Sequence, residues 1–225
     1  MEYKNGKLQL SNVTLVAVTS VKVRETIKAL EYSMKDIDFG DVTLITHRKP
    51  FFLPKTIRYQ HIKKLKNIDD FNYTMVYNLG DYIKTDFILL VHYDGFVVNP
   101  KSWKDEFLDY DYIGSPWPMP KDDFSYRDIN GEIQRVGNSV SIRSKRLLDY
   151  PKQSNMKWEA DHGFFHEDGF ICVKNHHLFE AAGMKIAPLE VAKDFGREHP
   201  IPENENVDPF IFHKWYGPNK DYPHF

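Results

Sequence analysis

Two apolar, β-branched runs separated by one segment of helical periodicity constrain the fold of this chain more than any other feature. VTLVAV at 13–18 and VTLIT at 42–46 have the length and composition of buried strands. The intervening TSVKVRETIKALEYSMK places apolar residues at helical spacing, and Phe39-Gly40-Asp41 is predicted to end this helix. The three segments make a βαβ unit with a right-handed crossover. We therefore predict an α/β fold with a mostly parallel central sheet flanked by helices and a mixed α+β C-terminal part.

The next elements follow from the same periodicities. FILLV at 87–91 is the most apolar run and predicts a central strand covered on both faces, ending abruptly in HYDG. The pattern also predicts a short strand at 57–62, a helix at 71–83, an extended loop at 114–120, a strand at 136–144, and a loop followed by a helix within 167–183.

Length and charge limit the kinds of function. A chain of 225 residues suits one domain. The net charge of −2 provides no overall positive field for nucleic acid, and we interpret KKLK at 63–66 as a solvated surface run. The sequence shows no transmembrane stretch and no signal peptide, so we expect a cytoplasmic protein. Cys172, the only cysteine, is predicted to be a buried structural thiol.

Asp94 is the best single candidate for a site residue, because it directly follows the apolar strand. A carboxylate held there can coordinate Mn²⁺ or Mg²⁺, and such a cation can bridge a diphosphate. His213 and Lys214, late in the chain, could assist as a metal ligand and as a cation for the diphosphate. The competing interpretations are that Asp94-Gly95 is an ordinary turn pair and that His213 is a core histidine.

Two further pairs could complete a site. Thr19 and Ser20 follow the first strand, where open α/β sheets place ligands, although they could simply cap the next helix. Glu167-Asp168 is an acidic pair in an apolar context, and one member could be the general base that deprotonates an acceptor hydroxyl. We choose Asp168 for this role. The alternative is a pair of surface acids that cap the following helix.

The blocks LLVHYDGFVVNPKSW, EFLDYDYIGSPW, VGNSVSIRS, HEDGFICV and FIFHKW, in this order, resemble a group of GT-A glycosyltransferases over residues 13–215. More distantly, the GN and ED blocks are similar to those of β-1,3-galactosyltransferases and Fringe-type enzymes, which invert the anomeric centre. The resemblance implies transfer of a sugar from a nucleotide sugar, with UDP favoured, to an acceptor hydroxyl.

The resemblance also implies roles for residues. Asp94 and His213 would lie at the metal, Asp168 would be the base with Glu167 beside it, and the halves at about 10–100 and 101–225 would bind the nucleotide and the acceptor. We also expect His92 to bind the metal and Tyr112, Trp117 and Arg143 to bind the acceptor. The implied donor-binding residues are Thr19, Ser20, Asp94, Gly95, Gly137, Asn138 and Lys214.

The sequence departs from the family pattern at three places. His92 replaces a glutamine, Ser139-Val140 replaces a glycine and its neighbour, and the loop FGREHP leaves Arg197 and His199 without a role. The substitution at position 92 makes the metal dependence of a transferase an open question, and added bulk at 139–140 could shift the donor preference.

Two other classes of function remain open at this point. His92, Asp94 and His213 spell the two-histidine, one-carboxylate triad of non-haem Fe(II) oxygenases that use 2-oxoglutarate. Those enzymes use a double-stranded β-helix, which the βαβ pattern disfavours. The high aromatic content, 15%, would also permit a non-catalytic sugar-binding module.

Overall fold

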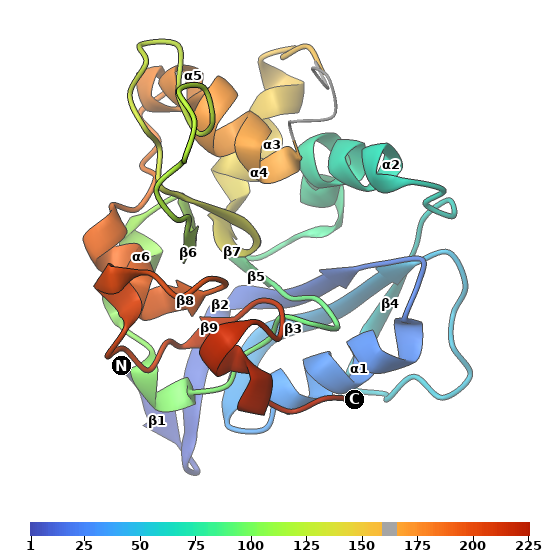
Figure 1. Ribbon diagram of the computed structural model, residues 1–225. Coiled ribbons are helices and arrows are strands. Elements are labelled where there is room, and N and C mark those ends of the chain that lie inside the picture. The colour runs from blue at the N-terminus through green and yellow to red at the C-terminus, as the bar shows by residue number, and fades with distance from the viewer. Residues whose placement is uncertain (159–165) are drawn as a thin grey trace.

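The computed structural model describes residues 1–158 and 166–225, and in them seven strands form one sheet (Figure 1). Along the sheet the order is β4-β3-β2-β5-β7-β6, and β1 pairs with β2 as a hairpin. Strands β2 to β5 run parallel to their neighbours among themselves, whereas β7 is antiparallel to both β5 and β6. The predicted α/β fold with a mostly parallel sheet is confirmed. The strands are β1 Tyr3–Lys4, β2 Lys7–Val18, β3 Ile37–Thr46, β4 Arg58–His61, β5 Phe87–Leu90, β6 Tyr112–Pro116 and β7 Val136–Ser144.

Helices cover both faces of this sheet (Figure 1). They are α1 Val23–Ser33, α2 Ile68–Tyr73, α3 Lys145–Gln153, α4 Glu167–Gly169, α5 His176–Ala181 and α6 Leu189–Phe195. A π-helical stretch, Thr74–Asn78, and a 3₁₀ turn, Leu79–Tyr82, continue α2, and a second π-helical stretch, Phe170–Lys174, continues α4. Strands β8 Gly196–Arg197 and β9 Ile211–Phe212 pair in a small separate sheet. In residues 1–158 and 166–225 no helix is long and apolar enough to cross a membrane.

The side-chain alternation of the strands explains the two-sided core. On β2, Leu15 and Ala17 pack on the face covered by α1, whereas Val16 and Val18 pack on the opposite face. Met75 and Leu79, from the helical run after α2, cover this second face. A strand buried on both faces has no solvated side chain, and this is why VTLVAV lacks an alternating polar pattern. Its one polar residue, Thr14, is buried and shares a 2.7 Å hydrogen bond with Thr85.

Three predicted boundaries were wrong, and two of them share one cause. Phe39, Gly40 and Asp41 do not end the helix but lie within β3, and Gly114 to Pro116 end β6 rather than starting a loop. A Cβ on Gly40 would lie 2.0 Å from the Ser11 carbonyl oxygen, and one on Gly114 would lie 1.6 Å from the Gly137 carbonyl oxygen. Both glycines therefore permit close strand approach next to register shifts rather than making turns. The third error is at 167–174, which is helical rather than a loop.

Candidate functional site

A tight turn follows β5 and places Asp94 just beyond the carboxyl end of this central strand. The His92 amide donates to the Gly95 carbonyl at 2.7 Å, and the Gly95 amide donates back to the His92 carbonyl at 3.2 Å. A Cβ on Gly95 would lie 2.6 Å from Val140 Cγ2 and 2.8 Å from His213 Cδ2. Gly95, predicted to bind the donor, thus has a packing role, because its missing side chain lets the C-terminal segment approach.

That C-terminal segment brings His213 to the same place. The Phe212 amide donates to the Phe96 carbonyl at 3.3 Å, and the Lys214 amide donates to the Asp94 carbonyl at 2.6 Å. Lys214 has a φ of 61°, a left-handed conformation that turns the chain after β9. Residues more than a hundred positions apart in sequence are therefore fixed against each other by backbone hydrogen bonds.

His92, Asp94 and His213 form a compact group that could hold a metal ion. One ligand atom of each lies within 4.8 Å of the others, and His213 Nε2 is 3.9 Å from Asp94 Oδ1. Burial lowers the pKa of His92 to about 4 and lowers the pKa of His213 well below its usual value, so both imidazoles are neutral at pH 7, the form that binds metals. Two imidazoles and one carboxylate suit a transition-metal divalent ion such as Mn²⁺ better than Mg²⁺, which prefers an all-oxygen shell.

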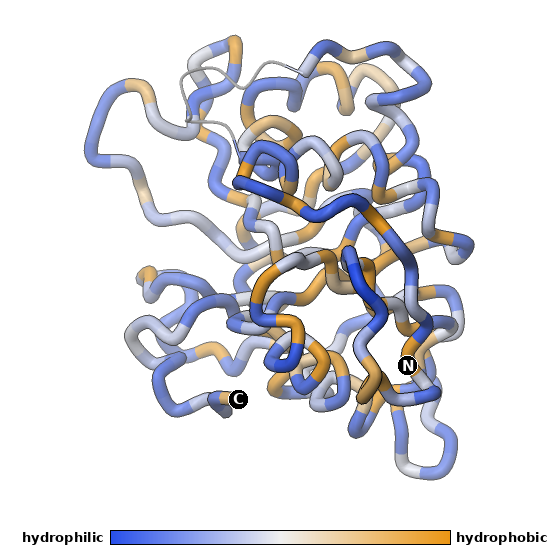
Figure 2. Tube along the Cα trace, turned by 90° about the vertical axis from the view of Figure 1, so that its right-hand side faces the viewer, coloured by the Kyte–Doolittle hydropathy of each residue, from blue (hydrophilic) through white to orange (hydrophobic). Residues whose placement is uncertain are grey.

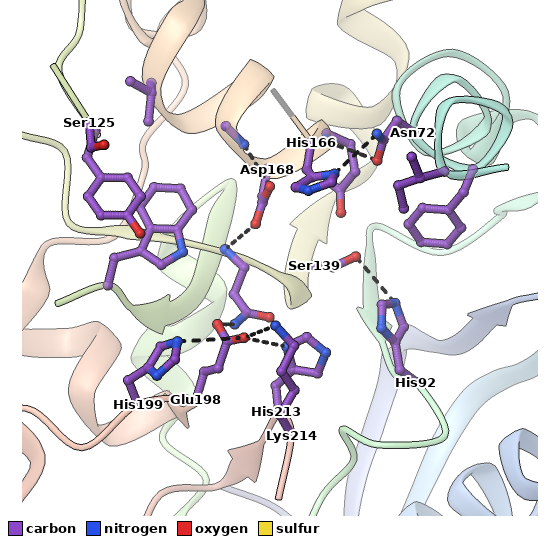
Figure 3. A pocket seen from close by; sticks show the side chains of 18 of the residues that line it. Asn72, His92, Ser125, Ser139, His166, Asp168, Glu198, His199, His213 and Lys214 are labelled. Atoms are coloured by element: carbon purple, nitrogen blue, oxygen red, sulfur yellow. Dashed lines mark hydrogen bonds and ion pairs between the residues drawn. The ribbon is translucent and has the colours of Figure 1, made fainter. Parts of the chain in front are cut away.

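Glu198, which no sequence argument identified, lies behind this group. Its side chain is 7% exposed, and its Oε2 accepts a 2.6 Å bond from Asn138 Nδ2. Its Oε1 accepts a bond from Lys214 Nζ and lies 3.5 Å from His213 Nδ1 (Figure 3). The available signal was its place in the FGREHP loop, where the sequence departs from the family pattern. Beside it, Arg197 bonds to Asn219 and to the Val207 carbonyl, which is a structural role.

Asn138 connects Glu198 to Asp168 across the site. Asn138 is buried in β7 and has a φ of 86°. Its backbone amide donates to Asp168 Oδ2 at 3.2 Å, whereas its side-chain amide donates to Glu198. The Gly169 amide donates to Asp168 Oδ1 at 2.8 Å. Burial raises the pKa of Asp168 despite this bond, which brings the carboxylate closer to the range of a useful general base. The structure thus brings two predicted residues, Asn138 and Asp168, into direct contact.

Glu167 has a different environment from Asp168. Its Oε2 accepts a 2.7 Å hydrogen bond from Arg143 Nη2, and both side chains are 1% exposed or less. Burial raises the pKa of Glu167, and the Arg143 charge opposes that rise. Glu167 therefore acts first as the partner of a buried guanidinium.

The predicted acceptor ligands differ in their position relative to the cavity. Arg143 lies over the Tyr112 ring at 5.0 Å, and the Tyr112 hydroxyl donates to the Asn138 carbonyl at 2.5 Å. Both residues are fully buried and neither lines the cavity, so the structure gives no support to direct acceptor binding by Tyr112 and Arg143. Trp117 does line the cavity and stacks on Tyr126, with ring centroids 4.8 Å apart.

Gly137, predicted to border the donor sugar, supports this Trp117 stack instead. A Cβ on Gly137 would lie 2.0 Å from two indole carbons of Trp117. The glycine lets the indole lie flat against β7, and the ring then forms part of the cavity wall.

A cavity of about 740 Å³ joins these groups (Figure 3). Its walls come from α2, the loop after β6, β7, α4 and the C-terminal loops, and they include Asp168, Glu198, His213 and Lys214. A volume of this size is ample for a sugar and part of an acceptor.

A second cavity of about 350 Å³ lies beside it and contains the predicted residues Thr19 and Ser20. It shares Ile68, Phe71 and His92 with the larger cavity. The Val21 amide donates to Thr19 Oγ1 at 3.1 Å, and the Leu65 amide donates to Ser20 Oγ at 2.9 Å. The two hydroxyls therefore stabilise the local turns as well as lining the cavity. Thr19 and Ser20 line the smaller cavity and Asp168 lines the larger one, and both cavities include His92.

Comparison with known proteins gives a family and a fold. The family model described as "Protein of unknown function (DUF5672)" matches residues 55–213. No curated protein matches the chain by sequence. An active-site mutant of LgtC superposes with a TM-score of 0.53 at 13% identity, covering 91% of this chain and 88% of that one. Glycosyltransferase GlyE of Streptococcus pneumoniae TIGR4, in its apo form, gives a TM-score of 0.50 at 12% identity and covers 98% of this chain and 57% of GlyE. These likenesses establish a fold that matches GT-A glycosyltransferase structures.

Proposed function

This chain belongs to the DUF5672 family, and we propose that it is a glycosyltransferase that moves a sugar from a UDP-sugar to an acceptor hydroxyl. The observation that carries the proposal is the group His92, Asp94 and His213 beside the carboxyl end of β5, in which His92 lines both cavities and His213 lines the larger one. A nucleotide sugar has two parts joined by a diphosphate, and two cavities joined at a metal-binding group suit that shape.

The two cavities suggest how the donor lies. The smaller cavity, about 350 Å³ in volume and lined by Thr19 and Ser20, would take the nucleoside. The larger cavity, with Asp168 and Trp117, would take the sugar and the acceptor. The diphosphate would then lie beside His92, Asp94 and His213.

The residues of the site supply three effects. A divalent ion on His92, Asp94 and His213 would neutralise charge on the departing diphosphate, and the Lys214 ammonium adds positive charge beside it. Asp168 would take the proton from the acceptor hydroxyl as that oxygen bonds to the anomeric carbon and the bond from this carbon to phosphate breaks. Attack from the side opposite the leaving group inverts the anomeric centre. Trp117 offers an apolar ring face against which a sugar can lie.

A thermal-shift screen tests this function against its alternatives. We expect UDP together with Mn²⁺ to raise the melting temperature more than UDP alone, Mn²⁺ alone, or GDP together with Mn²⁺. Stabilisation by 2-oxoglutarate with Fe(II), and none by nucleotides, would instead support the oxygenase interpretation of the same three ligands. Stabilisation by free sugars alone would support a non-catalytic sugar-binding module.

A further inference from the structure

One edge of the sheet carries an unusual concentration of positive charge. Residues 42–68 contain seven of the 30 lysines and arginines and none of the 32 aspartates and glutamates, although the whole chain has a net charge of −2. They include β4, the edge strand, with the loop 47–57 before it and the segment 62–67 after it. This edge lies on the right in Figure 1 and faces the viewer in Figure 2. The exposed cations are Arg48, Lys49, Lys55, Lys63, Lys64 and Lys66.

Two phenylalanines project from the tip of the loop 47–57. Phe51 is 97% exposed and Phe52 is 39% exposed. Pro50 and Pro54 flank them in sequence, and each proline starts a turn. The Leu53 amide donates to the Pro50 carbonyl at 3.2 Å, and the Ile57 amide donates to the Pro54 carbonyl at 3.0 Å. Two consecutive turns therefore hold the aromatic tip out of the core, and Pro restricts their backbone.

Basic residues lie close to the two phenylalanines, since Arg48, Lys49 and Lys55 belong to the same loop and Arg24 contacts Phe52 from α1. The guanidinium of Arg24, on α1, lies 5.4 Å from the centre of the Phe52 ring. Aromatic rings at a tip surrounded by lysines and arginines are typical of surfaces that insert into the headgroup region of an anionic bilayer. A nucleic acid could also use cations and rings, but it stacks its bases on ring faces in a groove. Phe51 and Phe52 instead stand at 90° to each other at the end of a turn.

We propose that the β4 edge, defined as β4 with residues 47–57 and 62–67, docks on an anionic lipid bilayer. Phe51 and Phe52 enter the interface, and the six exposed cations contact anionic headgroups. The basic run at 63–66, interpreted from sequence as solvated surface, belongs to this docking edge. Leu65 and Lys66 also line the second cavity, so the docked edge carries one wall of that cavity. The proposal does not depend on the sugar-transfer activity.

Co-sedimentation of the full chain with lipid vesicles tests the proposal. We expect binding to vesicles of equal parts phosphatidylcholine and phosphatidylglycerol, weakening as salt is raised, and little binding to phosphatidylcholine alone. The double variant Phe51→Ser/Phe52→Ser should bind about tenfold more weakly, because it loses the apolar insertion. The triple variant Arg48→Glu/Lys49→Glu/Lys55→Glu should bind about a hundredfold more weakly.

Matched controls separate this edge from general charge and hydrophobicity. Ile129→Ser removes an apolar side chain that is 65% exposed on another loop, and Lys4→Glu/Lys101→Glu/Lys220→Glu makes the same change of charge elsewhere. Both controls should bind vesicles nearly as well as the unmodified chain. Equal binding to neutral and anionic vesicles, or unchanged binding by the phenylalanine variant, would overturn the proposal. Tight binding to single-stranded RNA without vesicle binding would overturn it in favour of a nucleic-acid surface.

Discussion

Glu198 Oε1 lies 3.5 Å from Nδ1 of His213, whose other ring nitrogen lies 3.9 Å from Asp94. A carboxylate at Nδ1 favours the tautomer that carries its proton on that nitrogen and leaves Nε2 free to bind a metal. The buried Glu198 is itself held by Asn138 and Lys214. We therefore expect Glu198 to position His213 for the proposed metal ion.

We predict that Glu198→Gln lowers the affinity for Mn²⁺ by about 10- to 100-fold, because the amide removes the negative charge that faces His213 Nδ1 at 3.5 Å. Titration calorimetry measures the affinity, and circular dichroism checks that the fold is retained. Glu203→Gln makes the same change at a carboxylate that pairs with Arg135, and it should leave the affinity unaltered. An unchanged affinity in Glu198→Gln would remove the positioning role.

Asp168→Asn should lower kcat for sugar transfer by about 100- to 10,000-fold and leave UDP binding intact, because the amide cannot accept the acceptor proton. Burial raises the pKa of Asp168 above its usual 3.8, so the acidic limb of the kcat/KM profile should lie above that pH. On this acidic limb the activity falls as the pH is lowered, because the Asp168 carboxylate becomes protonated and no longer acts as a base. Asp208→Asn, an exposed site, is the control. Full transfer activity in Asp168→Asn would leave Glu167 as the next candidate.

The buried Arg143–Glu167 pair predicts a large stability effect. Glu167→Ala leaves the Arg143 guanidinium buried without its carboxylate and should lower the free energy of unfolding by about 3–5 kcal/mol. The double variant Arg143→Met/Glu167→Leu removes both charges and should recover most of that loss. Urea unfolding measures both. A double variant no more stable than Glu167→Ala would mean that the unpaired Arg143 charge is not the cause of the loss.

Gly137→Ala should shift Trp117, because the new methyl group would lie 2.0 Å from the indole. We expect a loss of about 1–3 kcal/mol in the free energy of unfolding, together with a change in tryptophan fluorescence as the stack on Tyr126 is disturbed. Stability and fluorescence identical to those of the unmodified chain would show that the wall of the cavity adapts without strain.

The sequence predicted the parallel part of the fold because the buried segments of β2, β3 and β5 are runs of apolar and β-branched residues. It failed at Gly40 and Gly114, where a glycine serves a close contact between neighbouring strands. Such a contact depends on which strands become neighbours, and local sequence does not encode this. The π-helical stretch at Thr74–Asn78 also has no signal in the apolar periodicity.

The site shows the same division between local and long-range information. Asp94 and Asp168 could be selected as candidates because each interrupts an apolar run, which is a local feature. Glu198 was missed because its partners, Asn138 and His213, come from distant segments. Arg143 was assigned to the acceptor because sequence alone does not reveal that a cation is buried against Glu167.

The central claim is that His92, Asp94 and His213 hold a divalent ion that in turn holds a nucleotide diphosphate. Calorimetric titration of UDP into the chain, with and without Mn²⁺, tests it most directly, with Asp94→Asn as the variant and Asp208→Asn as the control. We predict UDP binding that requires Mn²⁺, is preserved in the control and is at least tenfold weaker in Asp94→Asn, since one charged ligand is lost. Equal UDP affinity with and without Mn²⁺, or in Asp94→Asn and the unmodified chain, would contradict the claim.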